Sequence, residues 1–139
     1  MNFLKNSITS LQGIKYFTSL SRLDCNQCTN LTSLDISGMK SINTVIAYGC
    51  TSVNSVRVDR CSNLEYLDVC GAAISGIYLN SCHNLRWLNN KDNPKWPNKD
   101  NLLWFNNKDN QLLSQSDNHK WPNNKCNHKS LMNHQSKAL

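Results

Sequence analysis

The sequence lacks several features that would assign it to a large class of proteins. It has no apolar run long enough to cross a membrane, which excludes a membrane-spanning helix. It contains no Gly-rich phosphate loop, no G-x-S-x-G and no H-E-x-x-H motif, so we expect neither enzymatic activity nor a cofactor. The N-terminus, MNFLKNSITSLQGIKYF, lacks the apolar core of about 7–15 residues that a signal peptide needs. We therefore expect either a cytoplasmic protein or a piece of a longer exported chain.

The last 60 residues contain no Val, Ile, Thr, Gly or Tyr, although these five types supply 27 of the first 79. The charge changes at the same place. Residues 1–79 carry six basic and five acidic side chains, whereas residues 80–139 carry nine and four. We predict an N-terminal capping segment (1–19), a repeat domain (20–93) and an irregular or disordered tail (94–139). The tail has too few large apolar side chains to offset the entropy cost of ordering it.

The repeat domain shows a strict periodicity. A first aliphatic residue recurs every 10 or 11 residues, at Leu20, Leu31, Ile42, Val53, Leu64, Ile74 and Leu85. A second aliphatic residue follows three positions later, and in six units an apolar residue, once a cysteine, follows two positions after that, giving L-x-x-L-x-L. The final L-x-L alternation is the period of a β-strand, and stacked identical strands pair in parallel around a shared core. The fold class is therefore mainly β, a solenoid of parallel strands with few or no helices.

Successive units alternate in kind, so the full repeat is 21–22 residues long. The segments LTSLDISG, LEYLDVCG and ITSLQGIKYFTSL resemble the short leucine-rich repeats of surface and secreted proteins of Bacteroidetes-type bacteria. The resemblance covers roughly residues 8–90. It implies a leucine-rich-repeat solenoid that lies outside the cell or on its surface and binds proteins or glycans. The chain departs from that family in lacking an export signal and in its tail.

The candidate binding face follows from the alternation of side chains. We assign the units that begin at Leu20, Ile42, Leu64 and Leu85 to the concave strand side. The residues between the buried aliphatics should then point outward. Exposed aromatics beside charged residues have the composition of a binding hot spot, although they can also simply pack across neighbouring strands. The candidate binding residues are Arg22, Asp24, Thr44, Ile46, Tyr48, Tyr66, Asp68 and Trp87.

The cysteines allow a functional and a structural interpretation. Cys25 and Cys28 have the C-x-x-C spacing of a redox pair or half a zinc site. Both fall on core positions of the repeat, however, where their counterparts in other units are apolar. We therefore interpret them as small buried hydrophobic residues and predict no metal site. Cys50, Cys61 and Cys82 should be buried in the same way, whereas Cys70 should be exposed.

Three interpretations of the tail remain open. Its Lys and Trp residues would suit a single-stranded nucleic acid or an acidic surface. A metal cluster of His119, Cys126, His128 and His134 is disfavoured by its loose spacing and by the lack of an orienting carboxylate. The interpretation we prefer is a frameshift near residue 89 of a longer repeat gene, because Asn-Asn-Lys codons read one base later encode Thr-Thr-Lys or Thr-Thr-Arg.

The predicted function is that of a binding module that recognises a protein or a glycan through the concave face. Nucleic acid is not the expected partner, and the chain should be a monomer or part of a longer protein. The alternative is a structural fragment of a larger surface adhesin with no activity of its own, because about three repeats are close to the minimum for a stable array.

Overall fold

Each eleven-residue unit of the sequence forms one short strand followed by a turn. The computed structural model describes residues 7–90 and 92–93. It is a parallel β-solenoid of about three turns, which confirms the predicted fold class. Among those residues the helical structure is one 3-10 turn, η1 (Ile14–Tyr16). The strands are β1 (Arg22–Asp24), β2 (Ser33–Asp35), β3 (Thr44–Ile46), β4 (Ser55–Arg57), β5 (Tyr66–Asp68), β6 (Ile77–Tyr78) and β7 (Trp87–Asn89).

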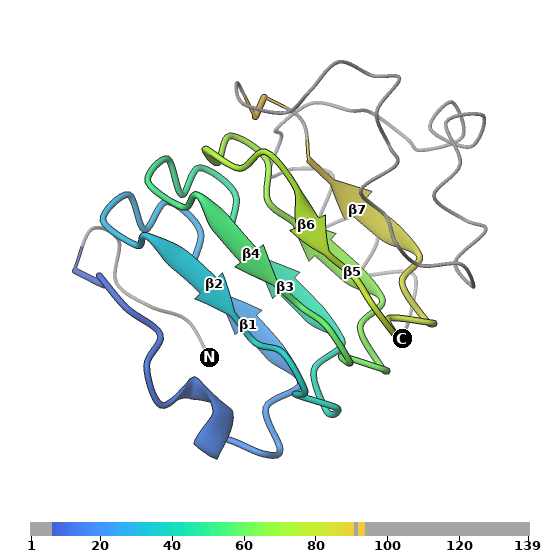
Figure 1. The fold of residues 1–139 in the computed structure, drawn as a ribbon. Coiled ribbons are helices and arrows are strands. Elements are labelled where there is room, and N and C mark those ends of the chain that lie inside the picture. The colour runs from blue at the N-terminus through green and yellow to red at the C-terminus, as the bar shows by residue number, and fades with distance from the viewer. Residues whose placement is uncertain (1–6, 91, 94–139) are drawn as a thin grey trace, which may run out of the picture.

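The strands form two parallel sheets that lie face to face (Figure 1). Sheet A has the order β1-β3-β5-β7 and contains the units that the sequence assigned to the candidate binding side. Sheet B has the order β2-β4-β6. Successive strands alternate between the sheets, so residues in register within one sheet are one full repeat apart, as Arg22 and Thr44 are. The register places chemically equivalent positions of the repeat side by side.

The core lies between the two sheets and consists of the predicted aliphatic ridges. The first-position residues Leu31, Ile42, Val53, Leu64, Ile74 and Leu85 are buried, as are the second-position residues Leu23, Leu34, Val45, Val56, Leu67 and Ile77. Leu20 and Leu88, in the first and last units, are partly buried and pack against this cluster. Burial of aliphatic surface therefore supplies the main stabilisation of the fold.

Every turn uses a left-handed backbone conformation at the same place in the repeat. Positive φ angles occur at Gln27, Gly38, Gly49, Arg60, Gly71, Ser81 and Asp92, which are spaced by 11 or 10 residues. Glycine adopts this conformation without steric cost, whereas other residues are strained in it. The turn is therefore dictated by the stacking of the repeat and not by glycine alone.

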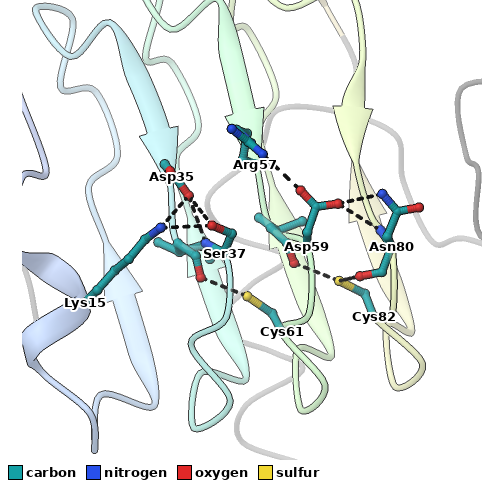
Figure 2. Close-up of polar contacts among 10 residues, drawn as sticks. Lys15, Asp35, Ser37, Arg57, Asp59, Cys61, Asn80 and Cys82 are labelled. Atoms are coloured by element: carbon teal, nitrogen blue, oxygen red, sulfur yellow. Dashed lines mark hydrogen bonds and ion pairs between the residues drawn. The ribbon is translucent and has the colours of Figure 1, made fainter.

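The residue after each left-handed position points into the core, and four of the cysteines occupy this position of the repeat. Cys28, Cys50, Cys61 and Cys82 are buried and not disulfide-bonded, and so is Cys25 on its strand position. This confirms that they are small buried residues. Three thiols also donate hydrogen bonds to the carbonyl oxygen of a residue one turn of the solenoid earlier: Cys50 to Cys25 and Cys61 to Ile36, both at 3.0 Å, and Cys82 to Val58 at 2.9 Å. Figure 2 shows the Cys61 and Cys82 bonds. The thiols thus connect successive turns of the solenoid.

The segment that precedes the first strand covers one end of the solenoid. Leu11 and Ile14 are buried in the core, and Ile8 packs against it. Lys15 of η1 reaches sheet B, where its Nζ lies 3.0 Å from Asp35. Within the part of the chain described, no helix has the length and apolar character that a membrane crossing requires. The predicted tail, with its proposed nucleic-acid and metal-binding residues, lies outside the described residues.

Candidate ligand-binding face

The candidate face is the outward side of sheet A, where four side chains form one column across the strands. The register pairs Arg22 with Thr44, Thr44 with Tyr66, and Tyr66 with Trp87. All four side chains are partly exposed. Because parallel strands lie about 4.8 Å apart, the column extends over roughly 15 Å. The structure therefore brings the four predicted residues of this column together.

The aromatic end of the column is the stacked pair Tyr66 and Trp87. Their ring centroids lie 4.1 Å apart and their planes differ by 5°. Burial, and to a lesser extent the nearby Asp68 carboxylate, raise the pKa of the Tyr66 hydroxyl above its ordinary value, against a smaller opposing effect of Arg22. The hydroxyl consequently stays protonated and can donate a hydrogen bond. The pair offers a rigid apolar surface with a polar group at its edge.

The other end of the column is polar. The Arg22 guanidinium lies 3.8 Å from the Asp24 carboxylate. Between the two ends, the Thr44 hydroxyl donates a hydrogen bond to the Asn43 side chain at 2.9 Å. The face thus changes from charged to aromatic along the sheet, which suits a ligand with a hydrogen-bonding part and an apolar part.

Two of the predicted binding residues are not available to a ligand. Ile46 is 1% exposed and Asp68 is 4% exposed, so the expectation that both face solvent is wrong. They occupy the middle column of sheet A, where the register places Ile46 between Asp24 and Asp68. A residue in the middle column has side chains of both adjacent strands beside it. On its own strand, the residues two before and two after it point to the same face. These neighbours surround the side chain and reduce its exposure. The predicted exposure of Cys70 is also wrong, since this residue is 0% exposed.

Comparison with protein-family models, with curated proteins and with solved structures finds no match. The resemblance to leucine-rich repeats therefore stays a prediction that rests on the motif.

Tyr48 is held by a residue that the sequence analysis did not single out. The Gln27 side-chain amide donates a hydrogen bond to the Tyr48 hydroxyl. Tyr48 is half-buried, and its main-chain oxygen also accepts a hydrogen bond from the Gln27 N–H at 2.7 Å. The two residues occupy adjacent turns on the same edge of sheet A, so Tyr48 extends the candidate face at that edge.

The sequence analysis also missed the role of the aspartates that end the strands. The Oδ1 atoms of Asp24, Asp35 and Asp68 each accept a hydrogen bond from the backbone N–H two residues later, at 3.3, 3.0 and 3.0 Å. This is an Asx turn, in which the carboxylate satisfies a turn donor. The recurrence of Asp directly after the second aliphatic was the available signal. Asp24 and Asp68 therefore hold turns of the solenoid, whatever contact they make with a ligand.

Within residues 7–90 and 92–93, no three His, Cys, Asp or Glu side chains gather where they could hold a metal ion. Two shallow hollows lie beside η1, and Lys15 lines both of them. The column on sheet A lies apart from these hollows and is a surface, not a cavity.

Proposed function

We propose that this chain is a non-catalytic binding module that recognises a protein segment or a glycan through the outward face of sheet A. The observation that carries the proposal is the column of Arg22, Thr44, Tyr66 and Trp87, aligned in register with its two rings stacked at 4.1 Å. Stacked aromatic side chains cost little entropy to immobilise, because each has only two rotatable bonds.

Rigidity of the surrounding residues also supports this function. Asp24 and Asp68 are fixed by bonds to turn N–H groups, and Tyr48 is fixed by Gln27. Side chains that are ordered before a ligand arrives lose less conformational entropy when it binds. A short column of this kind suits two or three sugar rings or a peptide segment, whereas a larger protein partner would also have to contact the turns.

The experiment that tests the proposal measures binding of the full chain to arrays of glycans and of secreted proteins. Any ligand found is then titrated against Tyr66→Ala and Trp87→Ala. Each substitution should weaken binding by about tenfold or more, as expected for a central aromatic anchor. Phe17→Ala is the control, because Phe17 is 52% exposed and lies outside both sheets.

Two results would contradict the proposal. Unchanged affinity in both sheet A variants, with a native circular dichroism spectrum, would place the site elsewhere. Failure of the chain to bind any arrayed ligand would favour the alternative, a structural part of a larger surface protein.

A further inference from the structure

The outward face of sheet B carries a second group of ordered polar and aromatic side chains, on the opposite side of the solenoid from the proposed site. Figure 2 shows Asp35 on β2, Arg57 and Asp59 on the neighbouring β4 and the turn after it, and Asn80 beside Asp59. Tyr78 is in register with Arg57 on the adjacent strand, and it is 60% exposed. It is one of the three large hydrophobic side chains exposed among the described residues, and it lies on β6, at one edge of sheet B.

The polar side chains of this face hold one another in place. The Asp59 carboxylate accepts hydrogen bonds from the Asn80 backbone N–H at 3.3 Å and from its side-chain amide at 2.8 Å. The Arg57 Nε lies 3.9 Å from the same carboxylate, and its guanidinium carbon lies 5.9 Å from the Tyr78 ring centroid. Arg57, Asp59, Tyr78 and Asn80 thus form a connected group, here called the Tyr78 cluster. Its donors and acceptors are positioned before a ligand arrives.

An open space lies beside the exposed ring. Gly76 occupies the position next to Ile77 of β6, two residues before Tyr78, and therefore faces the same side of the sheet. A Cβ atom at Gly76 would have no heavy atom within 4 Å. The equivalent positions on β2 and β4 are Ser33 and Ser55, whose side chains are also small. The row of outward positions that precedes Tyr78 on this face therefore carries only small residues.

The charges of the face argue against a strongly charged ligand. Arg57 lies beside Asp59, and Lys15 lies 3.0 Å from Asp35. Each of these cations has a carboxylate within 4 Å, so an anionic ligand would meet repulsion as well as attraction. Neutral hydroxyl groups, in contrast, can use both the carboxylate acceptors and the guanidinium and amide donors.

The size of the face argues against a protein partner. Three strands of three, three and two residues, spaced by about 4.8 Å and rising about 3.3 Å per residue, give a face of roughly 15 by 10 Å. A stable protein interface buries about 800 Å² on each partner, several times the area available here. One or two sugar rings match this area.

We propose that the Tyr78 cluster binds a neutral saccharide, with a sugar ring packed against Tyr78 over Gly76 and its hydroxyl groups bonded to Asp59, Asn80 and Arg57. A pyranose ring has an apolar C–H face that packs on an aromatic ring, and vicinal hydroxyls that match planar carboxylate, amide and guanidinium groups. This site is separate from the one proposed on sheet A and does not depend on it.

The test titrates the full chain with neutral linear hexasaccharides of glucose, mannose, xylose and N-acetylglucosamine, and with a sulfated heparin hexasaccharide. Binding is followed by calorimetry and by NMR. At least one neutral hexasaccharide should bind saturably and shift the Tyr78 ring signals. Tyr78→Ala should weaken this binding about tenfold, because it removes the packing surface.

A second variant keeps Tyr78 and changes only the space beside it. Gly76→Gln should fold, because its backbone lies outside the left-handed region and its side chain meets open space. It should weaken binding at least about fivefold by occupying the place of the sugar. Phe17→Ala, which changes an exposed aromatic residue outside both sheets, should bind as the natural chain does.

Several results would overturn the proposal. One is the absence of binding by every neutral hexasaccharide, and another is binding of the heparin fragment alone. A third is binding that neither Tyr78→Ala nor Gly76→Gln changes, and a fourth is binding of an arrayed protein through Tyr78 while no saccharide binds.

Discussion

The Asn93 side-chain amide donates a hydrogen bond to the carbonyl oxygen of Val69 at 3.0 Å, 24 residues earlier. The Cys82 thiol makes the equivalent bond to Val58, also 24 residues earlier, at 2.9 Å. Asn93 therefore stands in the last described unit where cysteine stands in earlier ones. It also donates to the Asn90 carbonyl at 2.7 Å, and its Oδ1 accepts from the Ile74 N–H at 3.4 Å. The repeat thus continues to residue 93, although Asn90 occupies the third position of this unit, where earlier units have an apolar residue.

Replacing Asn93 by Ala should destabilise the solenoid by about 2–3 kcal/mol, because three backbone groups of a buried turn lose their partner. Asn93→Cys should recover part of this loss, since a thiol can still donate to Val69. Urea unfolding followed by circular dichroism measures both. Equal stability of the Ala variant and the natural chain would show that water replaces the amide without cost.

Cys61 allows the same kind of test in the middle of the solenoid. Its thiol donates to Ile36, and burial raises its pKa to about 12, so the donor proton is retained at neutral pH. Cys61→Ala should cost about 1–2 kcal/mol, because the hydrogen bond is lost and a small cavity forms. Cys61→Ser keeps a donor and should cost less. A serine variant that is less stable than the alanine variant in urea would mean that apolar packing, not hydrogen bonding, selects cysteine here.

Gly38 and Gly76 form a matched pair for the turn conformation. A Cβ atom at either glycine would meet open space, but only Gly38, with a φ of 80°, has a left-handed backbone. Gly38→Ala should cost about 1 kcal/mol, because strain exceeds the entropy advantage of alanine. Gly76→Ala should be neutral or stabilise by up to about 1 kcal/mol. Equal urea midpoints for the two variants would contradict the left-handed turn at Gly38.

Asp35 should make the stability of the solenoid depend on pH in the acid range. Burial raises the pKa of its carboxyl, but the hydrogen bonds from Ser37 and the ion pair with Lys15 outweigh this, so the pKa lies below its ordinary value of 3.8. A lowered folded-state pKa means that the stabilisation is complete above pH 3.8 and is lost as the pH falls through the folded-state pKa.

The expected result is that Asp35→Asn is less stable than the natural chain at about pH 6 and that the difference shrinks towards about pH 2.5. Lys15→Gln should show a smaller version of the same trend, because the bonds from Ser37 remain. Urea midpoints measured at both pH values decide the point. A difference that stays constant with pH would mean that the charge of the Asp35 carboxylate does not stabilise the fold.

Tyr66 and Trp87 should be energetically coupled through their stacked rings. A double-mutant cycle with Tyr66→Ala, Trp87→Ala and the double variant should give a coupling energy of about 0.5–1.5 kcal/mol. The control cycle combines Tyr66→Ala with Tyr78→Ala on the opposite sheet, where the effects should add to within about 0.5 kcal/mol. The same coupling in both cycles would indicate a general loss of structure and not a contact between the rings.

The sequence by itself determined the architecture. The spacing of Leu31, Ile42, Val53 and their equivalents determines which side chains are buried. A residue that recurs at a fixed position of every repeat packs against the residue at the same position of the next turn of the solenoid. The assignment of alternate units to one sheet was correct for the same reason. Periodicity also predicted that the turn cysteines are buried, since their counterparts are apolar.

Only the tertiary structure decided which outward residues a ligand can reach. Alternation places Thr44, Ile46 and Tyr48 on one face, but it cannot show that Ile46 is enclosed there while Thr44 stays accessible. Solvent exposure on a sheet depends on the size and packing of neighbours on other strands, and these neighbours are about 22 residues away in the chain. The Tyr78 cluster was overlooked for the same reason. It arises from the hydrogen bonds between Asp59 and Asn80, which are 21 residues apart and meet only when the rungs stack.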